Sequence, residues 1–353
     1  MKIFPLKADY GDALVIEAQG IKKNVRIVID GGPETTSNMI ANYYNSLEFI
    51  DLLILTHFDE DHIKGLLEYF SKLEGTEKKI GLIWSNCARI IDFDNEENTS
   101  SYEDAFNLAT YLNRLQKKGL IGEWRDDIDT NTPTLNIDGV VIDVLSPTPE
   151  HLTELHNRYQ DYIEQHGLKD DPDTDEEISY KNVLLSSTKS LFELASKFKQ
   201  TYTTFMNTTS IAVRLSAEGK TLLLLADAEP SVIADSLERY GSKESEPMYV
   251  DLVKVSHHGS KANISPRLLK LIDCTHYLFT TSGGDAGAYH PDRMTIACLN
   301  YWPRKRNNEK LTLYFNYPLQ KIMERNTGLL QEKEKELFNI IDHYPNQIPT
   351  INI

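Results

Sequence analysis

The residues best suited to chemistry lie together in the segment 56–65, which has the sequence Thr-His-Phe-Asp-Glu-Asp-His-Ile-Lys-Gly. Four side chains that commonly bind metal ions fall within six residues: His57, Asp59, Asp61 and His62. In an extended turn the first three share one side, and the turn into a following helix brings His62 beside Asp61. Mixed imidazole and carboxylate ligands suit zinc, manganese or iron better than calcium. The alternative is a solvated helix start capped by Asp61.

Two later stretches place ligand-type side chains at the end of an apolar strand. Asp227 ends the run Leu222–Ala226, where its carboxylate is well placed to bridge two cations or, alternatively, to cap the next helix. His257 and His258 follow Val255. Adjacent histidines at a strand end do not easily point the same way, so one of them is expected to bind metal and the other to face substrate or a carboxylate. We assign the metal to His257 and the catalytic role to His258, although the sequence leaves the choice open, as it leaves open a plain surface pair.

Three weaker candidates also lie beside predicted strands or helices. Asp30 ends an early strand and either orients a metal-binding histidine or starts a turn. Asn207 lies in a stretch that is typical of a loop and helix cap, and His290 either contacts a leaving group or caps a helix. We retain Asp30 as support for a ligand, and Asn207 and His290 as catalytic candidates. Tyr10 and Asp12, in the first turn, are explained by turn chemistry alone.

Short apolar runs that alternate with amphipathic segments must position these side chains. Strands are predicted at 2–6, 13–18, 25–29, 52–55, 211–215, 221–225, 252–255 and 277–280, and helices at 35–47, 63–73 and 266–271. This alternation predicts a layered α/β protein.

The segment 86–206 differs from the rest and is predicted to be a largely helical insertion in a domain spanning 1–305. Its helical segments lie near 102–118, 150–166 and 180–199, around a strand pair at 135–145. Residues 306–353 are expected to form a C-terminal extension with one apolar run.

Composition narrows the class of partner and the compartment. The 353 residues carry 37 basic and 53 acidic side chains, a net charge of −16, which excludes a broad basic surface that wraps nucleic acid. The three cysteines, Cys87, Cys274 and Cys298, form no CxxC pair, which favours a reducing compartment. No apolar run is long enough for a signal peptide or a membrane span. We therefore expect a cytoplasmic protein without a membrane partner.

The combination of these motifs resembles the metallo-β-lactamase fold superfamily. The resemblance is carried by Asp30, the cluster 57–62, Asp227 and His257-His258-Gly259-Ser260. Asp59 stands where the usual His-x-His-x-Asp-His cluster has its second histidine. That replacement, the stretch Val-Lys-Val-Ser-His-His-Gly-Ser and the later His-Pro are similar to the hydrolase domain of the ComEC/Rec2 type, here without its membrane region. The resemblance covers roughly 1–85 and 207–302.

The resemblance implies a four-layer αββα sandwich, the metallo-β-lactamase fold, in which strand-end loops gather two divalent metal ions. His57 and Asp59 would hold the first ion. Asp61, His62 and one histidine of the 257/258 pair would hold the second, with Asp227 between the ions. Asn207 stands where the family has a further metal-binding histidine, so the first site is expected to be weak. Zinc and manganese are the expected ions.

The expected activity is metal-dependent hydrolysis by an activated water, which Asp61 would orient. A phosphodiester is the first substrate choice, in nucleic acid, a nucleotide or a small molecule, and Lys254, Lys261 and Arg267 would then provide either a local cationic patch or solvated surface charge. An alternative is a lactone, thioester or carboxylic ester hydrolase. An alternative of another class is a non-catalytic metal-binding module that meets a protein partner through the insertion 86–206.

Overall fold

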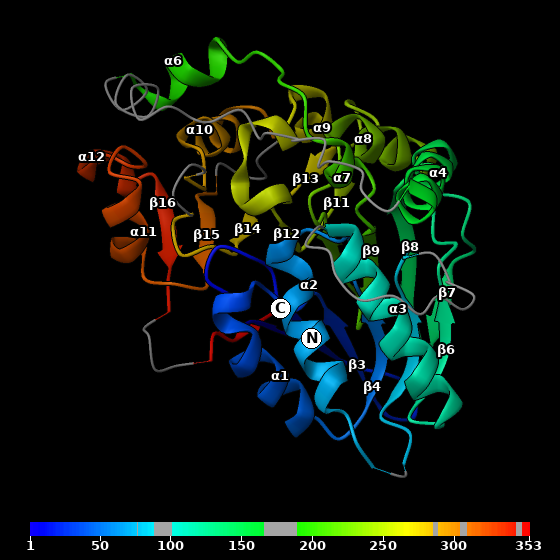
Figure 1. Cartoon of the computed structure of the whole chain (residues 1–353). Helices are drawn as coiled ribbons and strands as arrows, with labels where there is room; N and C mark the ends of the chain where they lie inside the picture. The colour runs from blue at the N-terminus through cyan, green and yellow to red at the C-terminus, as the bar shows by residue number, and fades with distance from the viewer. Residues whose placement is uncertain (76, 88–100, 166–188, 285–288, 304–308, 344–347) are drawn as a thin grey trace.

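Two β-sheets packed face to face form the centre of the protein (Figure 1). The computed structural model describes residues 1–75, 77–87, 101–165, 189–284, 289–303, 309–343 and 348–353. The first sheet has seven strands, in the spatial order β17 (Ile351–Asn352), β1 (Lys2–Pro5), β2 (Leu14–Gln19), β3 (Asn24–Ile29), β4 (Ile50–Ile54), β5 (Ile80–Trp84) and β6 (Ile121–Arg125). The second has eight, in the order β16 (Phe338–Ile341), β15 (Leu311–Phe315), β14 (His276–Phe279), β12 (Leu252–Lys254), β10 (Lys220–Leu224), β9 (Ala212–Ala217), β8 (Val140–Ser146) and β7 (Leu135–Ile137). A small third sheet pairs β11 (Met248–Tyr249) with β13 (Ile272–Asp273).

Apolar side chains on both faces of the central strands explain why the sheets pack against each other and against helices. In β4, Leu52 points into the core between the two sheets, whereas Leu53 joins the cluster beneath the helices. In β10, Leu222 and Leu223 divide in the same way. Successive side chains of a strand point to opposite faces, so a continuous apolar run serves two cores at once.

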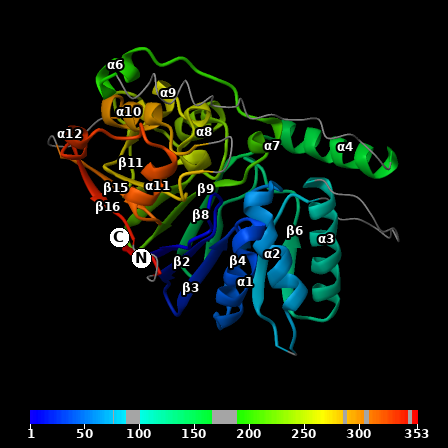
Figure 2. The same ribbon diagram turned by 60° about the vertical axis from the view of Figure 1, so that its left-hand side comes forward.

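Helices cover the outer face of each sheet (Figure 2). On the seven-stranded sheet these are α1 (Ser37–Ser46), α2 (Glu60–Lys72) and α3 (Ser101–Lys117). On the eight-stranded sheet they are α6 (Leu191–Ser196), α8 (Pro230–Arg239), α9 (Pro266–Lys270), α10 (Arg293–Tyr301) and α11 (Leu319–Arg325). The expected four-layer αββα sandwich is therefore confirmed.

The segment 86–206 contributes to both sheets as well as to the helical layer. It contains β6 at one edge of the seven-stranded sheet, and β7 and β8 at one edge of the eight-stranded sheet. Its helices include α3, α4 (Pro149–Gln165), α6 and the short α7 (Phe205–Thr208). The strand pair predicted at 135–145 corresponds to β7 and β8, whereas β6 and the entry of all three strands into the central sheets do not follow from a largely helical insertion. The first part of the helix predicted at 180–199 lies outside the described residues.

The segment 306–353 likewise continues the core. The apolar run predicted there forms β15, which pairs in parallel with β14, and β16 pairs with β15. β17 pairs with β1 at the edge of the other sheet. The boundary predicted at 305 therefore separates strands of one sheet rather than two folded units. Within the described residues, every helix is too short or too polar to cross a membrane.

Candidate metal centre

The predicted metal ligands come together because they follow neighbouring parallel strands. β3 and β4 are parallel, and so are β10 and β12. Asp30 follows β3 and His57 follows β4, whereas Asp227 follows β10 and His258 follows β12. The carboxyl ends of parallel strands lie at one edge of a sheet, so these loops meet above the core.

Helix α2 is held close to the strand ends by glycines. A Cβ atom at Gly65 would lie 2.0 Å from the carbonyl oxygen of Gly31, and one at Gly11 would lie 1.9 Å from the carbonyl oxygen of Asp61. The backbone amide of Gly31 also donates to the carbonyl of His62 at 2.6 Å. These close approaches fix the first turn of α2, which carries Asp61 and His62.

Four donor atoms face one another at the centre of this group. Asp61 Oδ2 lies 3.1 Å from His258 Nε2 and 3.5 Å from His62 Nε2. Asp227 Oδ2 lies 3.5 Å from His62 Nε2 and 4.0 Å from His258 Nε2. A tetrahedral ion with bonds of about 2.1 Å needs neighbouring donors about 3.4 Å apart. These distances therefore suit one divalent ion.

His57 and His62 both use Nδ1 for contacts with the protein and leave Nε2 toward the site. His62 Nδ1 donates to Asp30 Oδ2 at 2.8 Å. The Thr56 backbone amide and hydroxyl donate to the two oxygens of Asp30, each at 2.8 Å, so the Thr56 hydroxyl oxygen can accept from His57 Nδ1 at 3.0 Å. This arrangement fixes both tautomers, as is usual for metal-binding histidines. The expected supporting role of Asp30 toward a histidine thus has a direct geometric basis.

His257 and His258 likewise use Nδ1 for contacts with the protein. His258 Nδ1 donates to the carbonyl of Thr280 at 2.8 Å, and His257 Nδ1 donates to Asn263 Oδ1 at 3.0 Å. Both histidines have left-handed backbone angles, with φ of 46° at His257 and 52° at His258. The two adjacent rings can therefore face the same site, although a regular strand end would separate them.

A second set of donors lies beside the first. His57 Nε2 is 3.4 Å from Asp59 Oδ2, and His257 Nε2 is 3.6 Å from Asp227 Oδ2. The His57 and His62 rings are 4.2 Å apart between centroids, which places the two sets side by side. Asp227 Oδ2 lies within 4.0 Å of His62, His257 and His258, so its carboxylate contacts three of the clustered histidines.

The helix-cap alternatives are not what the structure shows. The N-cap of α2 is Asp59 and that of α8 is Glu229, so neither Asp61 nor Asp227 occupies a cap. Asp292, rather than His290, is the N-cap of α10. The hydroxyl of Thr204 caps α7, which contains Asn207 as a buried residue.

Buried carboxylates and imidazoles hold one another in their charged forms. Burial disfavours charge on His62, but the Asp61 and Asp227 carboxylates outweigh it and raise its pKa well above the usual range. Burial also opposes charge on His258, whereas Asp12 and Asp61 raise its pKa to about 10. The pKa values of Asp61 and Asp227 are held well below normal, against burial, by the neighbouring histidines. The buried carboxylates therefore stabilise positive charge in this region, and a divalent ion can supply that charge.

Unpartnered polar atoms provide a further test of whether a metal fits. Among the described residues, buried atoms without a hydrogen-bond partner include His57 Nε2, His62 Nε2, Asn207 Oδ1 and Asp227 Oδ1. Buried polar atoms are rarely left without a partner, so each needs a reason. All four belong to residues of this site and are atom types that bind divalent ions. The donor set therefore fits a metal centre.

His290 lies at the rim of the same group. Its ring centroid is 5.2 Å from that of His257 and 6.4 Å from that of His258. Burial and the positive charges of these two histidines lower the pKa of His290 well below its usual range. Its Nδ1 is buried and has no hydrogen-bond partner among the described residues. His290 is therefore a neutral imidazole at the site.

Two residues of the site were missed or misjudged from the sequence. Asp12 was explained as turn chemistry, but it lies with His62, Asp227 and His258 in one group of side chains that can hold a metal. Lys254 was expected at a surface, but it is 1% exposed and forms an ion pair with Asp12. A charged residue inside the apolar stretch Leu252–Val255 was the available signal, because lysine is almost never fully buried unless it is paired.

The geometry also favours a different division of the histidine pair. His258 Nε2, not His257 Nε2, lies within 4.0 Å of both Asp61 Oδ2 and Asp227 Oδ2, and His258 also belongs to the metal-holding group with Asp12, His62 and Asp227. His257 instead lies between Asn263 and Asp227, with the amide nitrogen of Asn207 at 3.3 Å from its Nδ1.

Comparison with solved structures finds proteins of the metallo-β-lactamase fold. No protein-family model and no curated protein sequence matches the chain. The metallo-β-lactamase fold protein YhfI from Bacillus subtilis is 10% identical, with 100% of both chains covered and a TM-score of 0.38. Zn²⁺-bound PqqB from Methylobacterium extorquens is 10% identical, with 100% of both chains covered and a TM-score of 0.42. A long form RNase Z from yeast is 13% identical, with 95% of this chain and 44% of that chain covered and a TM-score of 0.37. These values are too low to transfer any residue role.

Proposed function

We propose that the protein is a metal-dependent hydrolase that cleaves phosphodiesters with water. The observation that carries the proposal is the ring of four donors from Asp61, His62, Asp227 and His258, in which each carboxylate oxygen lies 3.1–4.0 Å from both imidazole nitrogens. Such a ring of imidazoles and carboxylates is suited to hold zinc or manganese. When bound, divalent ions supply Lewis acidity, which lowers the pKa of water and offsets charge on substrate oxygens.

In this proposal the two sets of donors hold two ions. Asp61, His62 and His258 would hold one ion and His57 and Asp59 would hold the other, with Asp227 as a candidate ligand of both. Asn207, whose Oδ1 is buried and unpartnered and whose amide nitrogen lies 3.3 Å from His257 Nδ1, would serve as a weak ligand of the second ion or as a contact to substrate. The second ion is therefore expected to bind more weakly than the first.

Two histidines remain to act on the substrate. His257 presents Nε2 toward Asp227 because Asn263 accepts the proton of its Nδ1. His290, with its buried and unpartnered Nδ1, is placed to make a hydrogen bond with a leaving oxygen. Both assignments leave Asp61 to bind metal and to orient the attacking water.

A phosphodiester is favoured because the donors are rich in oxygen and because the motif resembles the ComEC/Rec2-type hydrolase domain. The basic residues near the site provide less positive charge for binding phosphate than the sequence suggests. Lys254 is buried in an ion pair, and Arg267 pairs with Asp235 and Glu238. The net charge of −16 therefore favours a nucleotide or a short strand over long duplex DNA. We place the protein in the cytoplasm, in keeping with three buried free cysteines.

The test is a substrate panel with the metal-loaded protein. Hydrolysis of bis-p-nitrophenyl phosphate is compared with that of a nitrophenyl ester, a thioester and a lactone, and metal content is measured in parallel. His62→Ala and Asp227→Ala should each lower phosphodiesterase activity at least ~100-fold and reduce bound metal, because each substitution removes one donor of the proposed metal site. Asp235→Asn, which changes a surface carboxylate of α8, is the matched control.

The outcomes separate the candidate functions. Ester or lactone turnover without phosphodiesterase activity would assign the alternative hydrolase class. Stoichiometric metal binding without turnover of any substrate would assign the non-catalytic module. Phosphodiesterase activity that survives thorough chelation would refute the metal assignment.

A further inference from the structure

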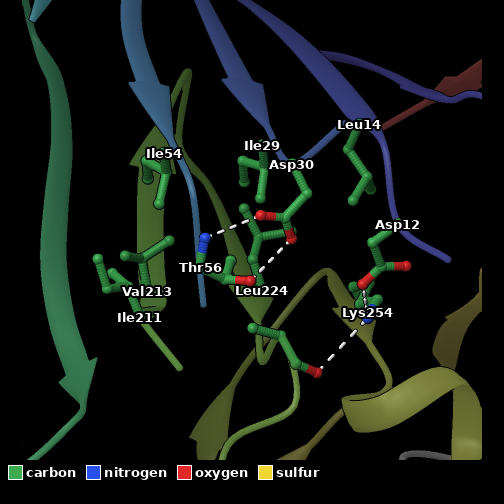
Figure 3. A pocket seen from close by; sticks show the side chains of 11 residues that line it. Asp12, Leu14, Ile29, Asp30, Ile54, Thr56, Ile211, Val213, Leu224 and Lys254 are labelled. Atoms are coloured by element: carbon green, nitrogen blue, oxygen red, sulfur yellow. Dashed lines mark hydrogen bonds and ion pairs between the residues drawn. The ribbon is translucent and has the colours of Figure 1, made fainter. Parts of the chain in front are cut away.

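A fully buried ion pair joins the two sheets directly beneath the metal centre. Asp12 lies in the loop between β1 and β2 of the seven-stranded sheet, and Lys254 is the last residue of β12 in the eight-stranded sheet. Both side chains are 1% exposed, and the Lys254 ammonium contacts Asp12 Oδ2 (Figure 3). Both residues line a pocket of otherwise mostly apolar side chains. A buried ion pair is weak evidence for stability, because desolvation offsets its attraction, so its position suggests another role.

The second oxygen of Asp12 faces His258. Asp12 Oδ1 accepts a hydrogen bond from the Thr280 hydroxyl and lies 3.4 Å from His258 Nδ1. The same Nδ1 lies 2.8 Å from the Thr280 carbonyl. Two acceptors therefore surround His258 Nδ1, which must carry the proton. When the ring is neutral, as a metal ligand must be, this requirement places the lone pair on Nε2, the nitrogen 3.1 Å from Asp61 Oδ2.

Lys254 acts on the neighbouring loop, which carries Asp227. Its ammonium lies 3.5 Å from the Ala226 carbonyl, an oxygen that also accepts from the His257 backbone amide at 2.8 Å. Ala226 has a left-handed φ of 46°, which costs free energy for a residue with a Cβ atom. The Lys254 ammonium therefore contacts both this carbonyl and Asp12, which Figure 3 labels beside it. The contact thus supports the backbone conformation from which Asp227 projects.

The backbone of Asp12 completes the connection to α2. Its amide donates to the Asp61 carbonyl at 3.1 Å, and its carbonyl accepts from Gly32 at 2.8 Å. The pair of Asp12 and Lys254 therefore touches the segments that carry Asp61, Asp227 and His258. These are three of the four facing donors, and they come from both sheets.

We propose that Asp12 and Lys254 are positioning residues that preset the donors of the Asp61–His62–Asp227–His258 site before an ion binds. The proposal rests on the metal site of the proposed function. Asp12 belongs to the group that can hold a metal, but its two oxygens are engaged by Lys254 and Thr280, so it orients the donors instead of binding the ion itself. Lys254 is buried, so it does not act as a phosphate-binding cation. Loss of the pair should lower the metal affinity of this site and leave the rest of the fold largely intact.

The experiment measures Zn²⁺ affinity of the full-length apoprotein by competition with a chromophoric chelator, and the Co²⁺ absorption spectrum as a report on ligand geometry. Asp12→Asn and Lys254→Met should each lower affinity 10- to 100-fold, the usual effect of losing a residue that orients a ligand. They should also change the Co²⁺ spectrum. The matched control is Arg214→Met, which breaks the largely buried Arg214–Asp143 pair between β8 and β9. It should lower thermal stability without changing either metal readout.

A milder variant keeps the test decisive if these proteins do not fold. Thr280→Val removes the hydroxyl that donates to Asp12 but keeps both charges, and should lower Zn²⁺ affinity several-fold. Unchanged affinity and spectrum in every folded variant would overturn the positioning role while leaving the proposed function intact. Absence of stoichiometric metal binding in the wild type would instead overturn the proposed function, and this proposal with it.

Discussion

Replacement of Asp30 by asparagine tests how the protein orients His62. Asp30 is fully buried, and its carboxylate accepts three hydrogen bonds of 2.8 Å, two from Thr56 and one from His62 Nδ1. Its φ of 59° is left-handed, a conformation that asparagine adopts as readily as aspartate. Asp30→Asn therefore changes the charge and the hydrogen-bonding pattern without adding backbone strain.

The expected effect follows from where the new amide nitrogen points. The Thr56 backbone amide can only donate, so the asparagine oxygen must face it and the NH₂ group must face His62. His62 Nδ1 then has to accept, so the neutral ring that a metal requires carries its proton on Nε2, the atom that faces Asp61 and Asp227. A proton at the metal-binding nitrogen should lower Zn²⁺ affinity 10- to 100-fold, or about 1.4–2.7 kcal/mol. Loss of charge-assisted hydrogen bonds should lower the free energy of unfolding of the apoprotein by about 1.5–3 kcal/mol.

The assay combines Zn²⁺ competition with nitrogen NMR of the histidine rings, which distinguishes the two tautomers. Asp251→Asn is the control, because this buried carboxylate also accepts a backbone amide, that of Thr221, but lies outside the metal centre. It should lower stability and leave Zn²⁺ affinity unchanged. Wild-type affinity in Asp30→Asn, together with a proton still on His62 Nδ1, would refute this explanation of the site.

Three further predictions concern the second ion, the fold and α2. Asn207→Ala should lower metal content from about two ions toward one per chain, because it removes a buried unpartnered oxygen; mass spectrometry that finds both ions retained would contradict this. Glu334→Gln leaves Arg293 buried without its bidentate partner and should lower the free energy of unfolding by about 3–5 kcal/mol at pH 7. Burial opposes ionisation of Glu334, but Arg293 outweighs it and lowers the pKa below 4.5, so this stabilisation is present above that pH and is lost as the pH falls. Denaturation curves at pH 3–8 should therefore show the variant and wild type converging in acid, and parallel curves would exclude the ion pair as the cause. Gly65→Ala places a Cβ atom 2.0 Å from the Gly31 carbonyl, so it should lower stability by about 1–3 kcal/mol and weaken Zn²⁺ binding; a variant unchanged in both would show that α2 can move freely.

Much of the fold follows from local patterns in the sequence. The apolar runs that form β4, β10 and β12 are buried on both faces, which is why they were recognisable as strands. Strand β15 and the edge strand β16 are harder to place, because β15 pairs with β14 and β16 pairs with β15 across long intervening segments. Strand pairing of this kind depends on tertiary contacts that periodicity does not encode.

The candidate site was only partly accessible from the sequence for a similar reason. The cluster 57–62 lies within one turn, and its spacing is visible directly. The importance of Asp12 depends on Lys254, a residue 242 positions later. The division between His257 and His258 depends on their left-handed backbone angles. A residue pattern specifies neither of these features, because both arise when the two sheets pack together.

Anomalous diffraction from crystals grown with zinc or manganese tests the central claim most directly. A strong anomalous peak is expected between Asp61, His62, Asp227 and His258, with a weaker second peak beside His57 and Asp59. An ion bound only at other residues, or crystals with no anomalous peak among these side chains at saturating metal, would contradict the proposed metal centre.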